Sequence, residues 1–231
     1  MSYPTRQWRE QWAGTVRTPD DMVRFVDAVG CCAKSAPPGY PDFPSQNAVM
    51  GELDAGTPDP WFWKDDLHIE KRIYYSRVFG GQPGFISYTL LPALMATNGA
   101  VADELLFNGE LSYQAQNIYH AIEVDGPIST KDLKRLLTPD AKRSAARVLI
   151  ELDRKFLITK SGITGRTRGT YSYIWDLVER WAPEVLDAAD RLGGKRAEAM
   201  LREHLAAFGM PPESDFYAKV LGWVPDPRLE E

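Results

Sequence analysis

The residues best suited to bind a charged partner are concentrated in the second half of the chain. Between Lys131 and Thr170 there are 11 Lys and Arg against 4 Asp and Glu, whereas the rest of the chain holds 16 against 28. Ammonium and guanidinium groups bind phosphate oxygens, so this basic segment predicts a local anion-binding surface on an otherwise acidic protein of net charge −5. A solvated basic helix is the alternative. The candidate contacts are Lys142, Arg143, Ser144, Arg147, Lys160, Arg166 and Arg168.

Residues for catalysis or metal binding are sparse. Cys31 and Cys32 are adjacent, which disfavours a disulfide and predicts reduced thiols. The three histidines are scattered along the chain, so we expect no metal site and no cofactor. Asp65, Asp66 and Glu70 surround His68, but neighbouring basic residues favour a solvated charged edge over an acid–base cluster. We therefore predict no catalytic residue.

Three helices and a β-hairpin are predicted to position the basic residues. Helical patterns cover residues 112–124, 131–137 and 141–155, and β patterns cover 157–160 and 170–175. A glycine-rich turn over 161–169 joins the two strands and carries Arg166 and Arg168. This order predicts a winged helix-turn-helix over residues 111–176. In such a unit the third helix enters the major groove of DNA.

The spacing of residues on the predicted helices separates an inward face from an outward one. Arg143 and Arg147 are four positions apart and share the outward face of the third helix. Ser144 could hydrogen-bond a phosphate or a base edge. We expect the inward faces of the second and third helices to bury Leu133, Leu136, Leu137, Ala146, Val148, Leu149 and Leu152.

The flanking regions give an α+β fold that is mainly α. Residues 1–110 form an aromatic-rich α+β region, with a helix over 20–29 between Thr18 and Gly30 and a hairpin of strands near 73–79 and 84–87. Residues 177–231 form a helical extension, with helices over 176–192, 195–208 and 214–221. No membrane span or secretion signal is visible, so we expect a cytoplasmic protein with no membrane partner. The oligomeric state stays open.

An aromatic group in the amino-terminal region has two interpretations. Its rings could stack an unpaired base, or they could form the core of that region, which is the interpretation we favour. The group consists of Trp61, Phe62, Trp63, Tyr74, Tyr75 and Phe79.

Two segments carry a family resemblance. Trp61 to Ser87, WFWKDDLHIEKRIYYSRVFGGQPGFIS, resembles a Trp-x-Trp-Lys segment that ends in Gly-Phe-Ile-Ser. Leu201 to Trp223, LREHLAAFGMPPESDFYAKVLGW, resembles a second winged helix truncated before its recognition helix and wing. With the central unit, these segments resemble AlkZ-related proteins, in the winged-helix superfamily of the AlkZ-type crosslink-repair DNA glycosylases. The resemblance covers most of the chain and implies a DNA partner.

The catalytic pair of those glycosylases is missing. They carry Gln-x-Gln or Gln-x-Asp after an amino-terminal helix, where the pair positions the hydrolytic water. If Gly30-Cys31-Cys32 matches the family's Gly-Leu-Leu, the pair falls on Ala33 and Ser35. Gln114-Ala115-Gln116 lies in a different element and is interpreted as a polar helix face.

The expected function is binding of double-stranded DNA without catalysis, as a regulator or an accessory factor in genome maintenance. One alternative is a glycosylase-like hydrolase with a non-standard site built from Asp65, Asp66, Glu70 and the aromatic group. The other is a winged-helix module that binds a protein partner.

Overall fold

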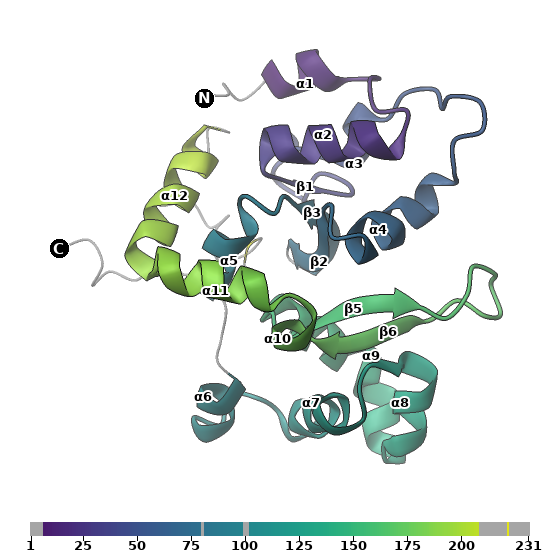
Figure 1. The fold of residues 1–231 in the computed structure, drawn as a ribbon, viewed down its shortest axis with the longest axis vertical. Helices are drawn as coiled ribbons and strands as arrows, with labels where there is room; N and C mark the ends of the chain where they lie inside the picture. The colour runs from purple at the N-terminus through teal and green to yellow at the C-terminus, as the bar shows by residue number, and fades with distance from the viewer. Residues whose placement is uncertain (1–6, 80, 99–101, 208–220, 222–231) are drawn as a thin grey trace. The chain divides into compact units, whose positions relative to one another are not determined.

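The computed structural model describes residues 7–79, 81–98, 102–207 and 221. The chain divides into two compact units, residues 1–97 with 187–231 and residues 98–186 (Figure 1). Each unit combines helices with one three-stranded antiparallel sheet. The prediction of a mainly helical α+β protein is confirmed. Along the described ranges, no helix combines the length and apolar character that crossing a membrane requires.

The first unit is built around a sheet in which β3 lies between β1 and β2. The predicted hairpin is confirmed as β2 and β3, and the three-residue strand β1 joins it through the pair Cys32 and Phe85. The elements are α1 (Gln7–Trp12), α2 (Pro19–Val29), β1 (Cys31–Ala33), α3 (Gln46–Val49), α4 (Pro60–Ile69), β2 (Tyr74–Phe79), β3 (Gln82–Ile86), α5 (Leu91–Asn98), α11 (Pro183–Leu192) and α12 (Gly194–Ala206).

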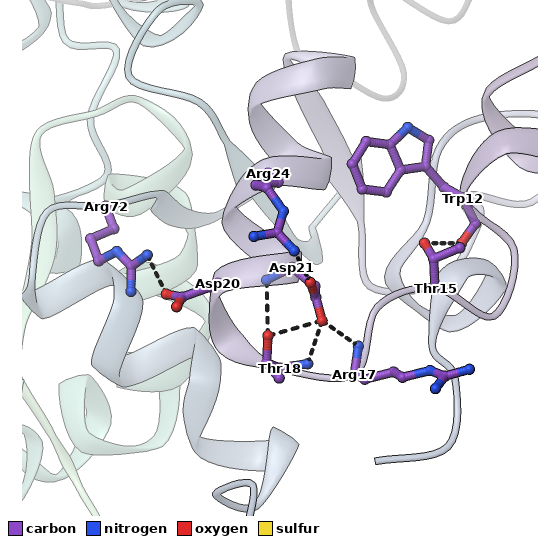
Figure 2. Close-up of polar contacts among 8 residues, drawn as sticks. All are labelled: Trp12, Thr15, Arg17, Thr18, Asp20, Asp21, Arg24 and Arg72. Atoms are coloured by element: carbon purple, nitrogen blue, oxygen red, sulfur yellow. Dashed lines mark hydrogen bonds and ion pairs between the residues drawn. The ribbon is translucent and has the colours of Figure 1, made fainter. Parts of the chain in front are cut away.

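Helix α2 begins and ends as the sequence predicts. The Thr18 hydroxyl accepts a hydrogen bond from the Asp21 amide at 3.2 Å, and the Asp21 carboxylate accepts one from the Thr18 amide at 2.9 Å (Figure 2). Burial raises the pKa of Asp21, but the hydrogen bonds from Arg17 and Thr18 outweigh it and hold the pKa below its usual value. Asp20 pairs with Arg72 at 2.6 Å, which ties the start of α2 to the segment after α4.

The second unit packs the helices α7, α8 and α9 with a sheet in the order β4-β6-β5, and the short helices α6 and α10 flank them in the sequence. Its core comes from α7, α9 and the sheet, and includes Ile118, Leu149 and Trp175. The elements are α6 (Ala102–Phe107), α7 (Tyr113–Asp125), β4 (Ile128–Ser129), α8 (Thr130–Leu136), α9 (Pro139–Arg154), β5 (Ile158–Ile163), β6 (Tyr173–Leu177) and α10 (Val178–Trp181).

Several details of the prediction are wrong. Ala145, not Ala146, faces the core, and Leu136 is 56% exposed because Leu133 and Leu137 fill the inward side of α8. The predicted helix over 176–192 begins later, because β6 continues to Leu177 and Pro183 starts the separate helix α11. The predicted helix over 214–221 lies outside the described residues except for Leu221.

Candidate nucleic-acid interface

Helix α9 exposes most of the basic residues predicted for it. Lys142, Arg143 and Arg147 are exposed, and Ser144 is partly buried. The Arg143 guanidinium pairs with Asp140 one turn earlier, and its side chain stays 76% exposed. An exposed pair of this kind contributes little to stability, so a phosphate can compete for the guanidinium. The opposite side of α9 packs Val148, Leu149 and Leu152 into the core and thereby fixes the orientation of the basic face.

The turn between β5 and β6, residues 164–172, forms the second basic element. Arg166 and Arg168 are exposed on it. Hydrogen bonds across the turn hold its backbone: the Thr164 amide donates to the Ser172 carbonyl at 2.9 Å, and the Tyr171 amide donates to the Thr167 carbonyl at 2.8 Å. A side chain at Gly165 would collide with the Thr170 hydroxyl, so this glycine permits the close approach of the two halves of the turn.

Lys160 was predicted to belong to the interface, but the structure buries it. Strand β5 continues to Ile163, so Lys160 lies within the strand and not in the exposed turn. Its Nζ pairs with Asp153 Oδ2 at 2.6 Å, where the two side chains are 4% and 1% exposed. The ammonium also lies 5.3 Å from the centre of the Trp175 ring. A phosphate outside the protein cannot reach this ammonium, so Lys160 belongs to the internal structure of the unit.

A groove that was not predicted from the sequence runs beside the turn. This hollow, which we call the α8 groove, has a volume of about 770 Å³ and lies between α8 and the turn. Its lining includes Lys131, Lys134, Arg135 and Tyr171. Thr130 also lines it, and its hydroxyl accepts a hydrogen bond from Trp175 Nε1 at 2.8 Å and donates one to the Tyr173 carbonyl at 3.2 Å, which ties the start of α8 to β6.

A hollow in the first unit has a different chemical character. It measures about 600 Å³, and its lining includes Asp27, Glu203 and His204. Burial lowers the pKa of His204 and raises that of Asp27, so the protein favours a neutral imidazole and a less acidic carboxyl group there. Two carboxyl groups and a neutral ring are poorly suited to a phosphate, in contrast to the cations of the α8 groove.

The acidic residues near His68 do not form the cluster considered from the sequence. Asp65 is buried and pairs with Lys64 at 2.7 Å, whereas Glu70 is exposed. The His68 Nδ1 accepts a hydrogen bond from the Tyr75 amide at 3.0 Å, which gives this histidine a structural role. Within the described ranges, no three His, Cys, Asp or Glu side chains come together as a metal site.

The aromatic group is mostly core, as favoured from the sequence. Trp63, Tyr74, Tyr75 and Phe79 are buried, and Phe62 is partly buried. Trp61 differs, because it is 50% exposed at the start of α4.

If Gly30-Cys31-Cys32 matches the family's Gly-Leu-Leu, the glycosylase pair falls on Ala33 and Ser35, which carry neither an amide nor a carboxylate group. Ala33 is buried in β1, and the Ser35 hydroxyl accepts a hydrogen bond from Asn47 Nδ2 at 2.8 Å.

The thiols of Cys31 and Cys32 are buried and form no disulfide, and burial raises the pKa of Cys31 to about 12. A thiol with that pKa remains protonated at neutral pH and is a poor nucleophile.

Comparison with known proteins gives one result for this chain. Comparisons with curated proteins and with solved structures give no match. A protein-family model described as AlkZ related matches residues 16–222, which include most of both units. The chain therefore belongs to the AlkZ-related family.

Proposed function

We propose that the second unit is a winged helix-turn-helix that binds double-stranded DNA. In this proposal α7, α8 and α9 are the three helices, α9 is the recognition helix, and the turn at 164–172 is the wing. The arrangement of β6 between β4 and β5 supports it, because this sheet joins the start of α8 to the hairpin that carries the turn. The DNA-binding element is the segment 111–176, between the amino-terminal region 1–110 and the extension 177–231.

The observation that carries the proposal is the exposure of basic side chains on both α9 and the turn. Arg143 and Arg147 lie one helical turn apart, and the opposite side of α9 is buried. A helix presented in this way can enter the major groove, which is about 12 Å wide, while Arg166 and Arg168 contact the neighbouring phosphates or minor groove. The acidic remainder of the chain disfavours contacts elsewhere, which confines DNA to this surface.

We further propose that binding, and not base excision, is the activity of this protein. Membership of the AlkZ-related family favours a role connected with DNA repair, as a regulator or an accessory factor. Ala33 and Ser35 at the positions expected for the pair support a role without hydrolysis, since neither side chain can position water as a Gln amide or an Asp carboxylate does. Buried, reduced Cys31 and Cys32 suit the cytoplasm.

Fluorescence-anisotropy titration of a labelled duplex with the full chain tests this function. We expect binding at low salt and a steep loss of affinity as salt is added, because each phosphate contact releases counterions from the DNA. With five or six contacts, the slope of log K against log salt would be about −5. Absence of binding at low salt would contradict the proposal, and a protein-docking role for the same surface would then be favoured.

A further inference from the structure

The α8 groove combines cations with tyrosine rings, a combination that the duplex-binding surface on α9 lacks. Lys131 and Lys134 are exposed on α8, on one side of the groove. Arg135 also lines it and pairs with Asp132 at 2.6 Å. On the other side, Tyr171 and Tyr173 are partly exposed. The groove thus offers charge for phosphates and flat rings for bases.

The tyrosines are held in place by the core. Tyr171 meets Tyr173 edge to face with ring centres 5.5 Å apart, and Tyr173 meets Trp175 in the same way at 5.7 Å. Trp175 is buried, and its indole nitrogen donates to Thr130. The three rings therefore form a ladder that leads from the core into the groove. A ring fixed in this way loses little conformational freedom when a ligand stacks on it.

We propose that the α8 groove binds an unpaired strand of DNA beside the duplex held by α9 and the turn. Tyr171 would stack on a base, because every base offers a flat face and stacking on an aromatic ring is tolerant of sequence. Lys131 and Lys134 would contact the phosphates of that strand. The groove adjoins the turn through Thr164, Gly169 and Thr170, so one strand leaving a duplex at the turn would pass directly into it.

This inference rests on the proposed DNA-binding function and gives it a substrate class, a junction between double-stranded and single-stranded DNA. An intact duplex cannot occupy the groove in the same way, because its bases are paired and stacked and their faces are not available to Tyr171. The protein would therefore prefer DNA with an unpaired end or an opened segment.

Anisotropy titrations of the full chain with three labelled probes test the inference. The probes are a blunt duplex, the same duplex with a short oligothymidine overhang, and the oligothymidine alone. We expect the overhang to increase affinity about tenfold, which corresponds to about 1.4 kcal/mol and falls within the range for one stacked base. Tyr171→Ala should abolish this increase, so that the overhang duplex binds the variant no more tightly than the blunt duplex does. Tyr171→Phe, which keeps the ring, should preserve the increase.

Two further variants complete the test. The double variant Lys131→Ala/Lys134→Ala should also reduce the gain from the overhang, whereas Tyr113→Ala, at an exposed tyrosine outside the groove, should not. Equal affinity for blunt and overhang duplexes, or a gain that Tyr171→Ala leaves intact, would overturn the inference while the proposed duplex binding stands. Binding of oligothymidine without any binding of blunt duplex would overturn the proposed function and leave the groove as a single-strand site.

Discussion

Replacing Asp153 with alanine is expected to lower the free energy of unfolding of the second unit by about 3–5 kcal/mol. Asp153 Oδ2 lies 2.6 Å from Lys160 Nζ, and both side chains are almost fully buried. Without the carboxylate, the Lys160 ammonium would remain in the core without its counter-ion. The adjacent Trp175 ring, 5.3 Å from the ammonium, can compensate for only part of that cost.

Urea unfolding followed by circular dichroism measures this effect. The double variant Asp153→Leu/Lys160→Met replaces both charges with apolar side chains of similar length, so it should be more stable than Asp153→Ala. Asp140→Ala is the matched exposed control, because it removes a carboxylate that pairs with Arg143 at the surface, and it should change stability by less than about 1 kcal/mol. A loss below about 1 kcal/mol for Asp153→Ala would show that the pair is not an essential part of the core.

The triple variant Arg143→Ala/Arg147→Ala/Arg168→Ala is expected to bind duplex DNA about 100-fold more weakly at low salt. Each arginine would contribute up to about 1 kcal/mol through a phosphate contact, and tenfold in affinity corresponds to about 1.4 kcal/mol. Three lost contacts should also make the slope of log K against log salt shallower by about 2.7, since each contact accounts for about 0.9. Anisotropy titrations at several salt concentrations measure both quantities.

A control with the same change in net charge separates specific contacts from general electrostatics. Arg191, Lys195 and Arg196 are exposed in the first unit, on α11 and α12. Replacing these three with alanine should leave the salt slope unchanged and weaken binding much less. If both triple variants lost affinity equally, the face formed by α9 and the turn would have no special role.

The sequence predicted the central elements well because independent local signals agree there. The apolar spacing of Val148, Leu149 and Leu152 fixes the buried side of α9, and the exposed positions of Arg143 and Arg147 follow from it. At α2, the Thr18-Pro19 start and the Gly30 end gave the correct boundaries. Ala145 and Ala146 were confused because neighbouring alanines hardly distinguish an inward face from an outward one.

Other features depend on contacts that a linear pattern does not contain. Lys160 was predicted to be exposed because the alternation of residues in β5 does not show where the strand ends. It also does not show that Asp153 pairs with Lys160. Helix α4 was missed because its Trp and Phe residues favour strands, although Asp59-Pro60 is a helix start that could have revealed it.

The short strands and the α8 groove were missed for the same kind of reason. Strands β1 and β4 contain three and two residues, too few for a periodic signal. The groove brings Lys131 and Tyr171 together from elements that are far apart in the sequence. The pairing of β4 with β6, and the hydrogen bonds of Thr130 with Tyr173 and Trp175, establish that proximity.

The most direct test of the proposed DNA-binding surface is a map of the amide resonances that shift when a blunt duplex is added to the isotope-labelled full chain. The proposed function predicts that the largest shifts fall on residues 142–147 of α9 and on the turn at 164–172. Amides of α2, α4 and α12 should change little. Large shifts confined to the first unit, or no shifts at low salt with saturating duplex, would contradict the proposal that this face binds DNA.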